Sequence, residues 1–403
     1  MSFKRKSGNT AETILSVSAD AIGLIDRGEC TLDDYLDCHA PVFYRRSVEH
    51  LLLCFYRNRG YFTQELKRFV QRPPENKVRN LLFAVFTQIC FQSAIAPESA
   101  VSVAVDAAKK FRADKFVNAV LRRFIAERVP VSTAPEVVLP PVVLKRWQKR
   151  YSQEEISGLA ALFTAEPPFT FRMEKRTQSV DFDCTFLCRK GLFDFYTSDS
   201  RKAVASQSLK EGAIYIQDPA TGYAPSLPDY KSVKSVLDIC AAPGGKSLMM
   251  AENLTDDAEL TAFDRSSRRQ ILTRQNFERR GLKHKVMSGD PAILTGTYDL
   301  VLADVPCSNT GVFRHRPDAL WRFSEKDLAE ITAIQREILE HAARLTACGG
   351  QLVYSTCSLE PEENIEMVEN FLVRHPEFTL RSGSTILPEP SADGASAFLL
   401  IKR

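Results

Sequence analysis

The chain has 403 residues, which is enough for two or three domains of ordinary size. Hydrophobic residues make up 44% and charged residues 26%, a globular composition that excludes a wholly disordered chain, a collagen and a coiled-coil rod. The formal net charge of +3 favours no class of partner by itself. The polar start and the lack of any run of about 18 apolar residues predict a soluble, cytoplasmic protein that has no membrane segment.

Ten cysteines in a chain of this length are too sparse for a disulfide framework. The one closely spaced pair, Cys184 and Cys188, has no histidine near it, whereas zinc sites usually show paired short spacings. We therefore expect no metal site. Most of the cysteines are expected to be small buried hydrophobic residues.

The first 130 residues are predicted to form an all-α domain. Apolar residues recur at helical spacing or in apolar runs of helix length over residues 11–24, 47–56, 78–91, 97–108 and 116–125. The same stretch holds 20 Lys and Arg residues against 14 Asp and Glu residues. Nucleic-acid binding and a solvated helical surface would both explain this balance, and charge alone favours the solvated surface.

The middle of the chain is predicted to hold a linker and a small mixed subdomain. Four prolines within residues 129–141 predict a linker, which we place at 131–141. Residues 142–212 combine a helical pattern near 153–164 with strand-like pieces around 169–173 and 192–196. They are predicted to form a small mixed α/β subdomain.

From residue 213 to the C-terminus the pattern alternates between strand, loop and helix. Strands are predicted at 236–240, 260–264, 285–288, 298–303 and 351–355, and helices at 246–254, 266–280 and 326–347. Gly349 and Gly350 are predicted to end the last of these helices as a C-cap. The alternation predicts a doubly wound parallel sheet of the Rossmann-like α/β class.

Chemically active residues follow each predicted strand. They are the loop 241–246, Asp264, Asp290, the stretch 304–307 and the stretch 356–358. In open α/β sheets ligands bind outside the carboxyl ends of the strands, so these residues are predicted to line one crevice.

The glycine-rich turn after the first of these strands indicates the kind of ligand. It lacks the G-x-G-x-x-G pattern of nicotinamide sites, and a phosphate-binding P-loop would need glycine where Cys240 stands. Asp264 comes 20 residues after Gly244, a position from which a carboxylate hydrogen-bonds ribose hydroxyls. A nucleoside cofactor without a phosphate clamp fits this pattern, and S-adenosylmethionine is the obvious one.

Several stretches of the chain resemble the motifs of a known family. The stretches 237–246, 304–311, 353–358 and 361–364 are similar to motifs of the RsmB (Fmu/Sun) family of S-adenosylmethionine-dependent rRNA cytosine-5 methyltransferases. The stretches 96–101 and 116–123 resemble the NusB-like RNA-binding domain of bacterial members. The resemblance implies a NusB-like domain over 1–130, an RNA-contacting subdomain over 142–212 and a methyltransferase domain over 213–403.

The resemblance also implies roles for individual residues. The cofactor loop would be formed by Cys240, Ala241, Ala242, Pro243, Gly244, Gly245 and Lys246. Asp264 would bind the ribose, Asp290 would lie by the adenine, and Asp304 would lie at the reacting end of the cofactor and target base. Cys357 would be the nucleophile that attacks C6 of cytosine, and Cys307 would help to release the product.

The implied substrate is a single-stranded or flipped-out cytosine of 16S rRNA, the small-subunit rRNA, methylated by a monomeric enzyme. Two alternatives are the same chemistry on tRNA and a catalytically inactive RNA-binding factor of ribosome assembly. The intact Asp304, Cys307 and Cys357 argue against the inactive factor. The residues Arg314, His315, Arg316, Trp321 and Arg322 predict either RNA contacts or an ordinary surface loop with a half-buried Trp.

Overall fold

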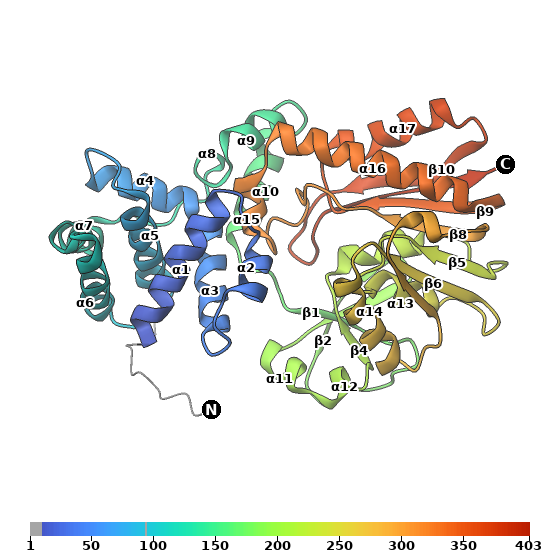
Figure 1. Ribbon diagram of the computed structural model, residues 1–403, viewed down its shortest axis with the longest axis horizontal. Helices are drawn as coiled ribbons and strands as arrows, with labels where there is room; N and C mark the ends of the chain where they lie inside the picture. The colour runs from blue at the N-terminus through green and yellow to red at the C-terminus, as the bar shows by residue number, and fades with distance from the viewer. Residues whose placement is uncertain (1–9, 93–94) are drawn as a thin grey trace. The chain divides into compact units, whose positions relative to one another are not determined.

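The computed structural model describes residues 10–92 and 95–403, and the chain forms two compact units (Figure 1). Unit 1 contains the described residues up to Glu166 together with Phe313–Ser324. Unit 2 contains Pro167–Val312 and Glu325–Arg403. No helix in the described part of the chain is long and apolar enough to cross a membrane.

Unit 1 is helical, as predicted for the front of the chain. Its helices are α1 (Thr10–Asp26), α2 (Leu32–Cys38), α3 (Arg45–Arg57), α4 (Arg59–Phe69), α5 (Asn76–Phe91), α6 (Pro97–Ala108), η1 (Lys109–Phe111), α7 (Asp114–Glu127), α8 (Pro135–Val138), α9 (Pro141–Trp147), α10 (Gln153–Thr164) and α15 (Pro317–Arg322). The helices predicted in the first 130 residues are confirmed as α1, α3, α5, α6 and α7. Helices α2 and α4 were not predicted.

The stretch predicted as a linker contains secondary structure. Pro135 and Pro141 each stand at the start of a helix, α8 and α9, where proline loses no helical hydrogen bond. Val138 and Leu139 between them are buried. These two prolines therefore begin short helices of unit 1. Unit 1 extends to Glu166 and includes α10.

The segment 313–324 is packed into unit 1. The indole N–H of Trp321 donates to the carbonyl of Tyr56 at 2.8 Å, and the backbone N–H of Leu32 donates to the carboxylate of Asp318 at 3.2 Å. The guanidinium of Arg57 donates to the carbonyl of Arg314, whose side chain is buried. Arg314 and Trp321 therefore both make contacts within unit 1.

Unit 2 contains a seven-stranded sheet with strand order β10-β11-β9-β8-β5-β6-β7. Its strands are β5 (Ser235–Asp238), β6 (Glu259–Asp264), β7 (Lys285–Ser288), β8 (Tyr298–Asp304), β9 (Thr346–Thr356), β10 (Phe378–Ile386) and β11 (Ala395–Lys402). The strands from β5 to β9 pair in parallel, which confirms the prediction, and β11 and β10 add an antiparallel edge. The helices and turns that connect the strands are η2 (Pro219–Gly222), η3 (Ala224–Ser226), α13 (Gly245–Ala251), α14 (Ser267–Arg279), η4 (Pro291–Ile293), α16 (Glu325–Leu345), η5 (Pro361–Glu363) and α17 (Ile365–Arg374).

The prediction that Gly349 and Gly350 end a helix was wrong. Helix α16 already ends at Leu345, and both glycines lie within β9. The pairing of β9 with β8 shifts register there, so that the glycines form a bulge at the start of the strand. Gly349 has φ +77°, a conformation that both a helix C-cap and a strand bulge favour, which explains the error.

A second sheet of unit 2 is four-stranded and antiparallel, with strand order β2-β3-β1-β4. Its strands are β1 (Thr170–Met173), β2 (Thr185–Lys190), β3 (Phe193–Thr197) and β4 (Ile214–Ile216). Two short helices, α11 (Ser200–Ala205) and α12 (Gln207–Lys210), lie between β3 and β4 in the sequence. The predicted strands near 169–173 and 192–196 are confirmed, whereas β2 and β4 were not predicted. The predicted region 142–212 is divided at residue 166 between the two units.

Two helical glycines of unit 1 provide a test of its packing. A Cβ added to Gly60 in α4 would lie 1.7 Å from the carbonyl oxygen of Val137, whereas one added to Gly158 in α10 would meet nothing within 4 Å. We expect Gly60→Ala to lower the free energy of unfolding by about 1–3 kcal/mol because the backbone near α8 must move. Gly158→Ala should raise it by about 0.5–1 kcal/mol through helix propensity. Equal effects in urea denaturation would contradict this packing.

Candidate functional site

The carboxyl ends of the parallel strands bring three of the predicted site residues, Lys246, Asp304 and Cys357, into one pocket. A pocket of unit 2 at this edge is lined by Asp218, Ala220, Thr221, Ala224, Lys246, Asp304, Val312, Ser355, Thr356, Cys357, Asp393, Gly394, Ala395 and Ser396. The cofactor-loop residue Lys246, the strand-end residue Asp304 and the thiol of Cys357 thus share one cavity. Asp218 and Asp393 were not predicted as site residues, because neither follows a predicted strand.

The loop after β5 is a tight turn, as its glycines predicted. Gly244 has φ +99° at the N-terminal end of α13, and its N–H donates to the carbonyl of Ala241 at 2.6 Å. A Cβ added to Gly245 would lie 2.8 Å from the side chain of Gln217. The loop therefore depends on both glycines for its close approach to neighbouring groups.

Asp264 ends β6 and lies beside this loop. Its carboxylate accepts hydrogen bonds from the backbone N–H groups of Ala242 at 3.2 Å and Ser266 at 2.8 Å. An ionised carboxylate has about four acceptor positions, so it can also accept from two ribose hydroxyls. Asp290 follows β7 as predicted, is exposed, and accepts from the N–H of Ala292 at 2.9 Å at the start of η4.

Asp304 ends β8 and forms an ion pair inside the pocket. The ammonium of Lys246 lies 2.6 Å from one carboxylate oxygen, and the hydroxyl of Ser355 donates to the other at 2.6 Å. Burial acts to lower the pKa of Lys246, but the attraction and hydrogen bond of Asp304, together with Cys357 and Asp238, outweigh it and the pKa is raised. The loop after β5 is therefore tied to the end of β8 by a charge-assisted hydrogen bond.

The two predicted catalytic cysteines are in contact. The Sγ atoms of Cys307 and Cys357 are 3.0 Å apart, and the Cys357 thiol donates to Oδ1 of Asn309 at 3.3 Å. The hydrogen bond with Cys357 and then burial raise the pKa of Cys307 well above that of an ordinary thiol. Cys307 therefore keeps its proton at neutral pH and is a poor nucleophile in this state.

Cys240 lies in the predicted cofactor loop, and burial together with Asp238 raises the pKa of its thiol. Asp238 itself was not predicted as a site residue, although an acid at the end of the apolar strand β5 was a usable signal. It is 1% exposed and accepts a hydrogen bond from the hydroxyl of Ser247 at 2.6 Å. Burial raises the pKa of Asp238 to about 7.

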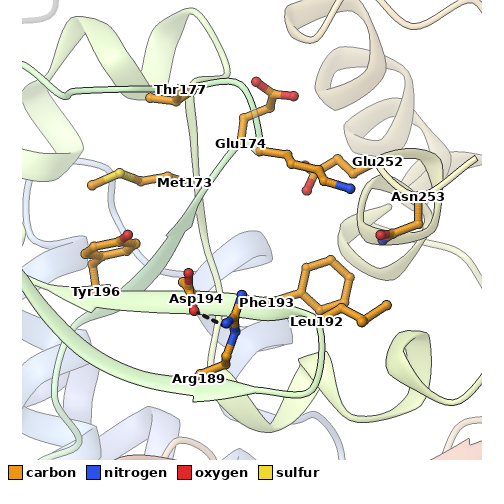
Figure 2. Close-up of a pocket in the computed structure, with 11 residues that line it drawn as sticks. Met173, Glu174, Thr177, Arg189, Leu192, Phe193, Asp194, Tyr196, Glu252 and Asn253 are labelled. Atoms are coloured by element: carbon orange, nitrogen blue, oxygen red, sulfur yellow. Dashed lines mark ion pairs between the residues drawn. The ribbon is translucent and has the colours of Figure 1, made fainter.

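A second pocket of unit 2 holds none of the predicted site residues (Figure 2). It is formed by the four-stranded sheet and the residues after α13, and Arg189 and Asp194 form an ion pair of 3.1 Å in it. Next to it, the buried Arg172 lies 2.5 Å from Glu252. The lining mixes acidic and basic groups, and nothing in it converges on one kind of ligand.

A parallel sheet with a glycine turn after β5, an acid after β6 and a polar pocket at the strand ends defines an S-adenosylmethionine-dependent methyltransferase. Residues 227–397 match the model of the 16S rRNA methyltransferase RsmB/F family, and residues 44–126 match the NusB family. The chain belongs to the RsmB family of methyltransferases, and S-adenosylmethionine is its cofactor.

Curated relatives carry the name ribosomal RNA small subunit methyltransferase B. The relative from Citrobacter koseri is 30% identical over 360 residues, which cover 83% of each chain. The relative from Shewanella oneidensis is 32% identical over 318 residues, which cover 74% of this chain and 73% of the relative.

Solved structures agree with the fold. PH0851 matches with a TM-score of 0.76 at 22% identity, over 99% of this chain and 100% of that chain. NSun6 from Pyrococcus horikoshii, solved with SFG, matches with a TM-score of 0.53 at 18% identity, over 65% of this chain and 98% of that chain.

The buried Asp238 predicts a pH dependence of stability. In the folded protein Asp238 holds its proton up to about pH 7, whereas in the unfolded chain an Asp ionises near pH 4. The folded state therefore binds the extra proton between these values, and raising the pH through this window lowers the free energy of unfolding. Asp238→Asn cannot ionise and should lose this dependence.

The measurement is urea denaturation of wild type and Asp238→Asn between pH 4 and 8. The stability of the variant relative to wild type should rise with pH across this range by more than about 1 kcal/mol. Asp256→Asn, at an exposed acid, is the control and should run parallel to wild type. A parallel curve for Asp238→Asn would show that this carboxyl is ionised in the folded protein.

Proposed function

We propose that the protein is an rRNA (cytosine-C5)-methyltransferase that modifies a cytosine of 16S rRNA through a covalent adduct between Cys357 and C6. The observation that carries the proposal is the 3.0 Å contact of the Cys307 and Cys357 thiols next to the ion pair of Asp304 and Lys246. The names of the relatives support small-subunit rRNA as the substrate class.

The chemistry explains why two thiols are needed. C5 of cytosine is a poor nucleophile. Once the Cys357 thiol has lost its proton to solvent, addition of the thiolate to C6 moves electron density to C5, which can then attack an electrophilic methyl group. The bound cofactor supplies that methyl group. After C5 has been methylated, a base removes its proton, the electrons re-form the C5–C6 double bond, and the C6–S bond breaks to release Cys357.

Cys307 is suited to the release step. It retains its proton in the free protein, and its sulfur lies beside that of Cys357. Once Cys357 is bonded to C6, the hydrogen bond between the thiols is gone, and with it the largest cause of the raised pKa of Cys307. After its own proton has passed to solvent, the thiolate of Cys307 can act as the general base and take the C5 proton onto its sulfur.

The remaining site residues have binding roles in this proposal. The loop 240–246 and Asp264 hold the cofactor, with the Asp264 carboxylate on the ribose hydroxyls, and Asp290 lies by the adenine. Asp304 orients the reacting groups, and Lys246 compensates its charge at 2.6 Å. The target cytosine must be single-stranded or flipped out to enter such a pocket. The NusB-matching part of unit 1 binds RNA and contributes no reacting group.

The ribose assignment predicts a specific loss of affinity. Asp264→Asn keeps the shape of the side chain but replaces one acceptor oxygen with a donor, so that a hydroxyl of the cofactor loses its partner. Calorimetry should show S-adenosylmethionine binding weakened about tenfold or more, because a charge-assisted hydrogen bond contributes about 1.5–3 kcal/mol. Asp256→Asn should bind as wild type does. Unchanged affinity of Asp264→Asn would rule out this assignment.

Replacement of the two cysteines is predicted to block different steps of the reaction. Cys357→Ala cannot form the C6–S bond and should lose methylation. Cys307→Ala should attack and accept the methyl group but release the product slowly. It should accumulate a protein–RNA adduct that survives denaturing electrophoresis.

The control is Cys348→Ala, at an exposed cysteine in β9, which should methylate at the wild-type rate and accumulate no adduct. Bisulfite sequencing of 16S rRNA identifies the modified base. An adduct in Cys357→Ala that is absent from Cys307→Ala would reverse the two roles.

A further inference from the structure

The carboxylate of Glu363 lies behind the two cysteines. Glu363 ends η5 and is completely buried. Its Oε1 accepts from the N–H of Ser308 at 2.8 Å and from the amide of Gln335 at 2.9 Å. Its Oε2 accepts from the hydroxyls of Ser308 and Ser358. Each oxygen therefore has two donors, and all four acceptor positions of the carboxylate are filled.

The donors come from both catalytic loops. Ser308 directly follows Cys307, and Ser358 directly follows Cys357. The two hydroxyls also lie 3.1 Å from each other. Gln335, from α16, donates in addition to the carbonyl of Pro306 at 2.9 Å, so the loop of Cys307 is held on both sides of the cysteine.

We infer that Glu363 is a positioning residue that fixes the two catalytic loops to each other and thereby sets the approach of the Cys307 and Cys357 thiols. The catalytic role of the two adjacent thiols rests on the proposed function, but their distance can be tested without RNA. A shift of about 1 Å in a reacting group can cost about a hundredfold in rate, so an anchor shared by both loops has a large effect.

The charge of Glu363 has a second consequence for the same pair. Burial raises the pKa of Glu363, and the hydrogen bonds from Ser308, Ser358 and Gln335 oppose that rise. The ionised form adds its negative charge to the hydrogen bond with Cys357 and to burial in raising the pKa of Cys307. Removal of that charge should therefore let Cys307 ionise at lower pH. A residue that only filled space would leave this titration unchanged.

The variant Glu363→Gln keeps the side-chain shape, and its oxygen can face the two N–H donors while its amide group faces the serine hydroxyls, which can rotate. Ser308→Ala and Ser358→Ala each release one loop and leave Glu363 in place. Glu366→Gln, at an exposed residue of α17, is the matched control. Thermal denaturation and cofactor calorimetry establish that each variant is folded.

The first readout is the distance between the thiols. The azo oxidant diamide converts two adjacent thiols into a disulfide and is itself reduced to the hydrazine, and peptide mapping measures the Cys307–Cys357 bond. Glu363→Ala removes all four hydrogen bonds, whereas Glu363→Gln lacks the same charge but can keep them. We expect trapping about tenfold slower in Glu363→Ala than in Glu363→Gln, with a smaller loss in each serine variant and Glu366→Gln as wild type. Equal trapping rates in Glu363→Ala and Glu363→Gln would overturn the inference.

The second readout is the pH profile of Cys307 alkylation by iodoacetamide in a Cys357→Ala background, with and without Glu363→Gln. The profile should move to lower pH when Glu363 is replaced. An unmoved profile would show that the charge of Glu363 does not raise the pKa of Cys307. Both readouts use the full chain without substrate. Failure of the anchor is thus distinguishable from failure of the proposed function, which only the RNA adduct assay tests.

Discussion

The parallel pairing of β8 between β5 and β9 is the constraint on which the site depends. In the register of the sheet Asp304 stands opposite Ser355, and Asp238 stands opposite Leu302. Because parallel strands point their carboxyl ends to one edge, the loops that follow all open into the same space. Pairing in this register places Lys246 on Asp304 and brings the thiol of Cys307 to that of Cys357 across 50 residues of sequence.

A layer of buried polar groups supports this edge. One of these groups is Asp238, which accepts a hydrogen bond from Ser247. The other is Glu363, which accepts from Ser308, Ser358 and Gln335. An isolated buried carboxyl is costly, and each of these is retained with hydrogen-bond donors that fix its orientation. Burial raises the pKa of both carboxyls, to about 7 for Asp238, and the hydrogen bonds that each accepts oppose that rise.

The sequence was sufficient for features that depend on local periodicity and motif spacing. The parallel strands, the glycine turn and the strand-end acids Asp264, Asp290 and Asp304 were predicted, because each follows from a few neighbouring residues. Asp218 and the anchoring role of Glu363 depend on contacts between distant segments, so no local pattern indicated them. The bulge at Gly349 was mistaken for a helix end because both require the same backbone conformation. The half-buried Trp321 was one of the two alternatives that the sequence left open, whereas its partner Tyr56, 265 residues away, was not predicted.

The inclusion of residues 313–324 in unit 1 affects the order of events during synthesis. The ribosome completes the first 166 residues of unit 1 about 150 residues before it supplies Asp318 and Trp321. At 5–20 residues per second, the nascent unit waits roughly 8–30 seconds with the N–H of Leu32 and the carbonyl of Tyr56 lacking the partners that α15 provides. The helical unit therefore begins to fold first on the ribosome, but its packing is completed only after β8 and the Cys307 loop of the other unit have been made.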